Sequence, residues 1–408
     1  MLYATNNNMS EILDIAIQTV KESKISFCRF ITGNDAGTTG SHQAGFYIPK
    51  CAAPLLFGEE CHRGENHEKW VKIKWQNDFE TASRFIYYGQ GTRNEYRITR
   101  FGRDFEFLLD RYVGSLLVIA EQADDYYQAF VLESDDDIET FLSYFSLSTE
   151  QTNQLIDISL AQNDDERLLQ AVSDAINPLH DFPQTKEMGQ MAQSIFNTIH
   201  NITDEQICTA PDKILFDWRD VESKIFFKLE DKLYRDVYTR PFANCNELMD
   251  FANSILNRRK SRAGKSLEHH LSAIFTANKL IFEEQAITEN NKRPDFLFPN
   301  SNCYHNFEFP SDDLTVLGAK TTCKDRWRQI LNEADRVDVK YLCTLQPGIS
   351  RAQLNEMEDY HVRLVVPQDL ISSYPVEYRS RIYSLSTFIA MVKNKQAQYT
   401  PISLIVNN

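Results

Sequence analysis

The hydrophobic pattern of this 408-residue chain changes period once, and this change limits the folds open to it. Up to about residue 135, apolar residues fall in short runs separated by turn signals such as Gly33-Asn34-Asp35. Beyond that point the spacing becomes helical, as in Ile138-Phe141-Leu142-Phe145. Because 408 residues exceed one typical core, we expect a multi-domain α+β protein. We place a β domain at 1–162, a linker at 163–184 and an α/β domain at 185–408.

The first domain is predicted to be mostly β-structure. Runs rich in aromatic and β-branched residues predict strands at 24–31, 45–48, 70–75, 84–88, 96–99, 115–121 and 126–132. Many short strands with only marginal helices are typical of a barrel or a sandwich.

The remainder is predicted to alternate helices and strands. The acidic stretch 162–184, with Pro178 and Pro183, is expected to be a linker with a possible helix in its middle. Helices are expected at 188–202, 217–236, 245–258, 266–280, 325–335 and 386–393, and strands at 296–298, 304–309, 315–320, 339–344 and 362–366. Such alternation indicates an α/β or mixed α+β core.

The charge distribution separates acidic from basic segments. The net charge of −15 argues against indiscriminate binding to nucleic acids. Basic residues nevertheless gather at 92–103, 256–270 and 318–328. Each cluster alone could be a solvated face, but all three lie beside a possible chemical motif, which favours a DNA-binding protein.

Composition also indicates the compartment. Apolar residues make up 42% and charged residues 25% of the chain, as in ordinary globular proteins. No apolar run has the length of a membrane span, and Met1–Ser10 lacks the features of a signal peptide. The eight cysteines include no Cys-x-x-Cys pair. A cytoplasmic protein with reduced thiols and no membrane contact is therefore expected.

Two residues in the second half suggest nuclease chemistry. Asp295 precedes the predicted strand 296–298, and Lys320 ends the predicted strand 315–320, which resembles the PD-(D/E)xK signature of nucleases. In that signature, carboxylates hold a hard divalent cation, and the lysine stabilises developing charge or orients the nucleophile. The second carboxylate should stand two residues before the lysine, where this chain has Gly318, which cannot bind a metal.

Two glutamates could belong to such a site. Glu333 lies on a predicted helix that could fold back against the strand and return a carboxylate to the vacant place. Glu268 lies beside the apolar stripe of the preceding helix and could face the site. Judged alone, each is more often an exposed helical acid.

Five segments together resemble the EcoRII-type restriction endonucleases, the PD-(D/E)xK branch that contains EcoRII, Ecl18kI and PspGI. They are residues 257–268, 285–289, 293–299, 320–335 and 362–367. Relocation of one acid to a following helix is characteristic of this branch. The resemblance implies that Glu268, Asp295, Lys320 and Glu333 form the catalytic site, and that Asp295 and Glu333 bind Mg²⁺.

The resemblance also implies DNA contacts in this half of the chain. Lys324, Asp325 and Arg326 match the stretch that reads C·G pairs. The chemistry agrees, because a basic side chain can donate to guanine and an aspartate can accept from cytosine. The alternative is a solvated helix start. Arg262 and Lys265 belong to a basic run expected to meet phosphates.

Residues 34–49 and 92–103 resemble the N-terminal part of the same family. There the fold is a pseudobarrel like the DNA-binding domains of plant-specific transcription factors, which binds a second, effector copy of the site and blocks the catalytic cleft until it does so. Arg93, Arg97, Arg100 and Arg103 are the implied DNA contacts. Alternation should put Arg97 and Thr99 on one strand face, away from Ile98.

The glycine-rich loop before the second predicted strand has a rival interpretation. Gly37 to Gly40 could cradle a phosphate, but the Lys-Ser/Thr ending of a P-loop is missing, so we do not expect nucleotide binding. His42 is expected to be a structural hydrogen-bonding residue.

These observations predict a homodimeric, Mg²⁺-dependent type II (IIE-like) restriction endonuclease that cuts double-stranded DNA at a short CCWGG-like site. A cognate DNA methyltransferase would act in the same restriction-modification system without binding the enzyme. One alternative is a DNA-binding regulator with an inactive nuclease domain, which Gly318 favours and Glu333 opposes. Another is a repair or junction-resolving nuclease.

Overall fold

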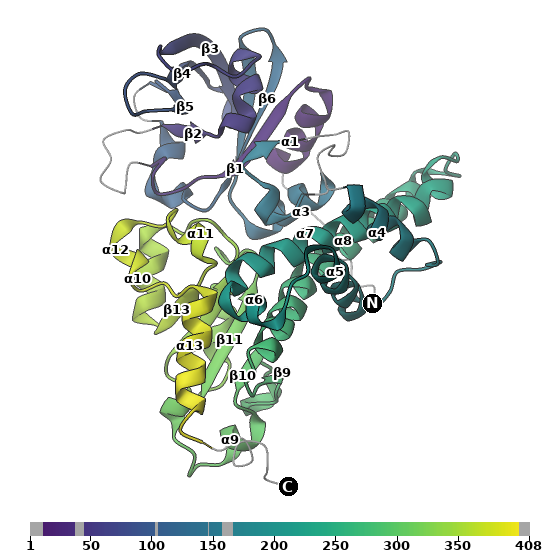
Figure 1. Cartoon of the computed structure of the whole chain (residues 1–408). Coiled ribbons are helices and arrows are strands. Elements are labelled where there is room, and N and C mark those ends of the chain that lie inside the picture. Colours follow the sequence, from purple (N-terminus) through teal and green to yellow (C-terminus); the bar gives the residue numbers. More distant parts are fainter. Residues whose placement is uncertain (1–10, 37–44, 103–104, 146, 157–165, 400–408) are drawn as a thin grey trace, which may run out of the picture. The chain divides into compact units, whose positions relative to one another are not determined.

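The computed structural model describes residues 11–36, 45–102, 105–145, 147–156 and 166–399 (Figure 1). It divides into two compact units. Unit 1 contains residues 1–160 together with two later segments, 347–354 and 373–376, and unit 2 contains the rest. The half-barrel unit is therefore built partly from the second half of the chain.

Unit 1 is a curled β half-barrel. Its eight-stranded sheet has the order β2-β5-β4-β3-β7-β6-β1-β8, in which all neighbours are antiparallel except β3 and β7. The elements are α1 (Glu11–Glu22), β1 (Ser26–Phe30), β2 (Phe46–Ile48), α2 (Ala53–Phe57), β3 (His67–Trp75), β4 (Glu80–Tyr88), β5 (Glu95–Thr99), β6 (Leu116–Ala123), β7 (Tyr126–Leu132), α3 (Asp135–Tyr144) and β8 (Gln154–Leu155).

Both faces of this sheet are covered near its centre, as alternation along β6 shows. Leu117 and Ile119 join the core inside the curl, which is rich in aromatic rings such as Trp75. Leu116 and Val118 join a second core under α1 and α3. This strand is therefore apolar on both sides, unlike a strand with one solvated face.

Unit 2 is an α/β domain with long helices. Its elements are α4 (Glu166–Ile176), α5 (Thr185–His200), α6 (Asp204–Thr209), α7 (Pro211–Tyr238), α8 (Cys245–Ala277), β9 (Glu283–Glu284), β10 (Phe296–Phe298), α9 (Ser301–His305), β11 (Thr315–Lys320), the 3₁₀ helix η8 (Trp327–Asn332), β12 (Lys340–Thr344), α10 (Arg351–Asp359), β13 (Val362–Val365), α11 (Gln368–Ile371), α12 (Val376–Arg379) and α13 (Leu385–Gln396). Two of them, α10 and α12, begin with residues assigned to unit 1.

A five-stranded mixed sheet carries the residues predicted to act in catalysis. Its order is β13-β12-β11-β10-β9, with β11, β12 and β13 parallel and β10 antiparallel to both of its neighbours. Helices α8 and α13 pack on it through Phe275, which contacts the rings of Phe296, Phe298 and Phe388. The sheet is thereby fixed against the C-terminal part of α8, which carries Glu268.

The predicted strands of unit 1 are confirmed, and so are α3 and the helix in the middle of the predicted linker, α4. Helix α1 was not predicted. The prediction for residues 245–280 was wrong, because one helix, α8, replaces the predicted pair and runs through the basic segment without a break.

Two further predictions in unit 2 need correction. Residues 304–309 form the end of α9 and a turn instead of a strand. The helix predicted at 325–335 is the shorter 3₁₀ helix η8, after which Glu333 is extended and Ala334 has a φ of 55°. Among the described residues, no helix combines the length and apolarity that a membrane span requires.

Candidate active site

The carboxylate of Asp295 is held in place by three hydrogen bonds. Phe296 pairs with Leu317 in the β10–β11 ladder, so the residue before β10 lies beside the end of β11. One carboxylate oxygen, Oδ2, accepts from the Ala319 amide at 2.8 Å and from Lys320 Nζ at 3.1 Å. The other, Oδ1, accepts from Gln285 Nε2 at 3.0 Å. Asp295 and Lys320 are therefore adjacent, as the sequence predicts.

The charges of Asp295 and Lys320 also influence the pKa of Glu333. Burial first, and then the negative charge of Asp295, raise the pKa of Glu333 to about 7, although Lys320, Lys292 and Lys340 oppose the shift. A carboxylate that is largely withdrawn from water and near another carboxylate favours a proton or a cation beside it.

Two residues from the loop before Asp295 hold the backbone on both sides of Glu333. Lys292 Nζ donates to the carbonyl of Asn332 at 2.7 Å, and a carboxylate oxygen of Glu289 accepts from the Asp335 amide at 3.1 Å. Sequence reasoning gave no role to Lys292 or Gln285, because both act by positioning other residues.

Glu268 lies on α8 at the edge of this group. Burial is the largest influence and raises the pKa of Glu268; a hydrogen bond from Lys265 Nζ, at 2.6 Å, lowers it, and the charge of Asp295 raises it again. The described residues contain no set of three or more His, Cys, Asp or Glu side chains arranged to hold a metal ion. The predicted pair of metal ligands, Asp295 and Glu333, stays a prediction.

The position of Gly318 explains why it carries no carboxylate. A Cβ added at Gly318 would lie 2.7 Å from Cγ2 of Ile330, a residue of η8. Contacts this short do not occur between real atoms, so η8 fills the space that a side chain at 318 would need. The same helix ends directly before Glu333.

The three residues predicted to read bases, Lys324, Asp325 and Arg326, are hereafter the reading segment. They lie in the turn between β11 and η8. Lys324 is 8% exposed, while Asp325 is exposed. The Arg326 guanidinium donates to the Thr322 hydroxyl at 2.7 Å. The segment begins four residues after Lys320, which ends β11.

The basic run on α8 divides into paired and exposed residues. Arg262 is 5% exposed, donates to the Ser223 hydroxyl at 3.2 Å and lies 3.6 Å from a carboxylate oxygen of Glu222 on α7. The predicted phosphate contact by Arg262 stays a prediction. Lys265 is exposed, beside Glu268.

The predicted DNA contacts of unit 1 lie on and around β5. Along this strand Tyr96 and Ile98 are buried while Arg97 is partly exposed, which confirms the predicted alternation. Arg93 and Arg100 are exposed on either side of the strand. Arg103, the loop from Gly37 to Gly40 and His42 lie outside the described residues.

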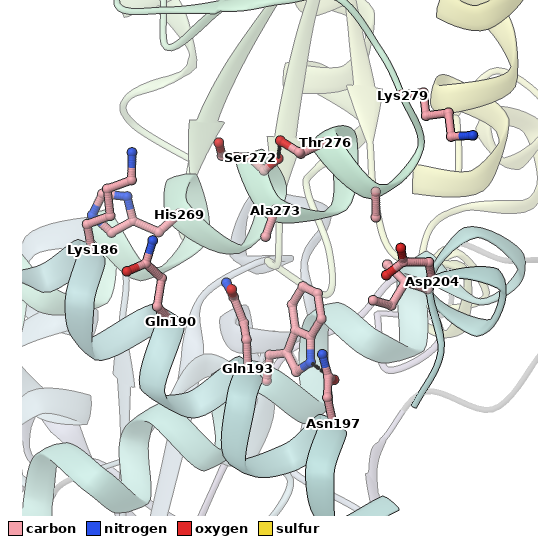
Figure 2. Close-up of a pocket in the computed structure, with 13 residues that line it drawn as sticks. Lys186, Gln190, Gln193, Asn197, Asp204, His269, Ser272, Ala273, Thr276 and Lys279 are labelled. Carbon is pink, nitrogen blue, oxygen red and sulfur yellow. Dashed lines mark hydrogen bonds between the residues drawn. The ribbon is translucent and has the colours of Figure 1, made fainter. Parts of the chain in front are cut away.

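A cavity of about 520 Å³ lies elsewhere in unit 2, between α5 and the C-terminal half of α8 (Figure 2). Lys186, Gln190 and Gln193 line it from α5, and His269 and Ser272 line it from α8. None of the four predicted catalytic residues lines this cavity. Asp295 and Lys320 lie instead at the start of β10 and at the end of β11.

Comparisons with known proteins agree over both units. The family model described as "EcoRII C terminal" matches residues 226–389, and "Restriction endonuclease EcoRII, N-terminal" matches residues 20–151. The chain is 36% identical over 410 residues to the type II restriction enzyme EcoRII of Escherichia coli, covering 94% of this chain and 97% of that protein.

Two solved structures show a more distant likeness. Metal-depleted Ecl18kI in complex with uncleaved, modified DNA is 17% identical with a TM-score of 0.45, covering 59% of this chain and 89% of that one. The PspGI–substrate DNA complex is 15% identical with a TM-score of 0.43, covering 53% and 95%.

Gly318→Ala should destabilise the protein, because its Cβ would overlap Ile330. We expect a loss of about 1–3 kcal/mol in the free energy of unfolding, measured by denaturant titration. In an Ile330→Ala background the same change should cost less. The matched control is Gly264→Ala, where nothing lies within 4 Å; removing a glycine from the interior of α8 should stabilise by roughly 0.5–1 kcal/mol. Equal effects at 318 and 264 would refute the steric explanation.

Glu333→Gln should change how stability depends on pH in the absence of divalent cations. The folded-state pKa of Glu333 is raised from 4.5 to about 7, so its stabilising contribution is present below pH 4.5 and is lost as pH rises through about 7. Glutamine does not titrate, so the variant does not lose this stability as the pH rises. In thermal unfolding with EDTA, the melting temperature of the variant relative to that of the wild type should therefore rise between pH 5 and pH 8. For Glu308→Gln, which changes an exposed glutamate, the difference in melting temperature from the wild type should stay constant over this pH range. The same constant difference for Glu333→Gln would contradict the buried position of Glu333.

Proposed function

The chain belongs to the EcoRII family of type II restriction enzymes, and we propose that it cuts double-stranded DNA at a short, C·G-flanked sequence with the help of Mg²⁺. The observation that carries the proposal is the hydrogen bond from Lys320 to Asp295, together with the electrostatic influence of these two residues on Glu333 and Glu268. The four residues come from separate elements of the fold.

The donor chemistry of this group fits magnesium. Mg²⁺ prefers hard oxygen ligands and usually takes only one or two carboxylates, with water and substrate phosphate completing its shell. Asp295 and Glu333 offer two such carboxylates, and burial, followed by the charge of Asp295, raises the pKa of Glu333, a cost that a bound cation would offset. When bound, Mg²⁺ supplies a polarised phosphate and a water of lowered pKa.

The chain's own residues would orient the reactants. The Ala319 amide and Gln285 fix both carboxylate oxygens of Asp295, so its direction does not depend on the substrate. Lys320 can turn its ammonium group from Asp295 toward the phosphate and stabilise the charge that develops there. Lys265 holds Glu268 and is exposed at the site's edge, where it can meet a neighbouring phosphate.

The reading segment would select the sequence. Lys324 and Arg326 are suited to guanine O6 and N7, and Asp325 to cytosine N4. The family resemblance favours a site like CCWGG. Such a site is nearly two-fold symmetric, which suits a homodimer that presents the same segment to each half. A cognate methyltransferase would protect the cell's own sites.

We further propose that residues 1–162 form an effector domain, joined through 163–184 to a catalytic domain at 185–408. Exposed Arg93 and Arg100 and partly exposed Arg97 would bind a second DNA site. The match of residues 20–151 to the N-terminal EcoRII family supports such a domain, which would restrain the catalytic domain until effector DNA binds.

The purified full-length protein should cut plasmid DNA in Mg²⁺ and leave ends that map to one short sequence. Asp295→Asn and Lys320→Ala should each lower the cleavage rate at least about a hundredfold while still binding DNA in a gel-shift assay. Asp338→Asn, which alters an exposed acid paired with His361, is the matched control and should cut normally.

Three other outcomes would change the proposal. Specific DNA binding without cleavage by the wild type would make the protein a regulator with an inactive nuclease domain. Cuts at branched DNA without a common sequence would indicate a junction-resolving nuclease. Full activity in Asp295→Asn would move the active site elsewhere.

Effector control predicts a rate difference between substrates. A linear duplex with one site should be cut slowly, and an added cleavage-resistant duplex carrying the site should speed cleavage about tenfold. Arg93→Ala/Arg100→Ala should lose this acceleration and keep the unstimulated rate. Lys21→Ala, an exposed change on α1, should be accelerated like the wild type. Acceleration that survives the double change would remove these arginines from effector binding.

A further inference from the structure

One buried side chain fixes the backbone from which the reading segment begins. Gln346 is fully buried, and its Oε1 accepts from two consecutive amides, Cys323 N at 2.9 Å and Lys324 N at 3.1 Å. A single acceptor can serve two neighbouring N–H groups only when the backbone folds around it. The conformation at the start of the reading segment is therefore tied to Gln346.

The sheet brings Gln346 to this place. Strand β12 runs parallel to β11, with Lys320 opposite Thr344, so the residues after both strands emerge side by side. The Leu345 amide donates to the Thr321 carbonyl at 3.3 Å, and the Thr344 hydroxyl donates to the same carbonyl at 3.2 Å. The end of β12 is thus hydrogen-bonded to the loop that follows Lys320.

A side chain of the reading segment, Arg326, is hydrogen-bonded to the same loop. The Arg326 guanidinium donates to the Thr322 hydroxyl at 2.7 Å and to the Thr322 carbonyl at 3.3 Å. Thr322 is fully buried and directly precedes the residues that Gln346 holds. The direction of Arg326 therefore depends on the same piece of backbone.

We propose that Gln346 is a positioning residue for sequence recognition: it touches no base, but it sets where Lys324, Asp325 and Arg326 present their polar groups. This inference rests on the proposed base-reading role of that segment. Hydrogen bonds to base edges weaken steeply with small changes in distance and angle, so a displaced loop loses discrimination first. An aliphatic side chain at 346 would leave two buried amides without their acceptor, which drives the loop to rearrange.

The test compares Gln346→Met, Gln346→Glu and a matched change elsewhere in unit 2. Methionine keeps the length and loses the acceptor, whereas a glutamate oxygen can accept from both amides. The control, Gln396→Met, removes the same kind of bond, since Gln396 Oε1 accepts from the Ile281 amide at 3.0 Å away from the reading segment.

The measured quantity is the ratio of kcat/KM for the cognate duplex to that for a duplex with one C·G pair replaced. Gln346→Met should lower this ratio roughly tenfold or more, the order of discrimination that one base contact supplies. Gln346→Glu should recover most of it, and Gln396→Met should leave it unchanged. Equal losses in the two methionine variants, or no recovery with glutamate, would overturn the proposal.

Hydrogen–deuterium exchange gives a readout that needs no catalysis. In the free protein, the amides of the peptide that spans 321–326 should exchange faster in Gln346→Met than in the wild type, and at the wild-type rate in Gln396→Met. Unchanged protection in Gln346→Met would refute the positioning role even if that variant cuts poorly.

Lys324→Ala and Arg326→Ala separate this inference from the proposed function. If neither variant loses discrimination, the reading segment does not read the bases, and the proposed function fails at that point. If both lose discrimination while Gln346→Met keeps it, the recognition proposal stands and the role of Gln346 is wrong.

Discussion

The antiparallel pairing of β10 with β11 is the constraint on which the candidate active site depends. It places Asp295 against the Ala319 amide and Lys320, and the hydrogen bond from Gln285 fixes the other carboxylate oxygen. Because strand register is set by side-chain alternation and burial, moving this ladder by one residue would turn Lys320 to the other face of the sheet. The chemistry thus depends on apolar residues that never touch a substrate, and above all on the pairing of Phe296 with Leu317.

Packing at Gly318 determines where the second carboxylate can stand. Ile330 occupies the space above Gly318, so β11 cannot carry a side chain there. The helix that excludes this side chain also delivers Glu333, whose burial near Asp295 raises its pKa to about 7. The fold therefore places negative charge in a poorly hydrated position, which is costly unless a proton or a cation neutralises it. In an isolated structural role, such an arrangement would only destabilise the protein.

Structure that depends on local residue patterns could be predicted from the sequence. Predictions failed where contacts with residues far away in the chain determine the structure. Strands of unit 1 were found because aromatic and β-branched runs alternate there. The break predicted between residues 258 and 266 does not exist, because the basic residues of this segment find acidic partners on α7: Arg259 pairs with Glu230, and Arg262 lies beside Glu222. The catalytic residues could be proposed from spacing and resemblance. Gln285, Lys292 and Gln346 could not, because Gln285 acts on the carboxylate of Asp295 and the other two act on backbone groups, and no sequence pattern connects these partners.

The two proposed activities of unit 2 share one structural support. Strand β11 ends in Lys320, and the reading segment begins a few residues later, while the end of β12 holds the intervening backbone through Thr344 and Gln346. A rigid connection of this kind links the choice of a base pair to the position of the phosphate beside it, because neither group can move far without straining the other. Flexible loops would permit tight binding to DNA but would not coordinate reading with cutting. If Lys324 reads a base as proposed, the short distance along the chain between Lys320 and Lys324 would itself contribute to specificity.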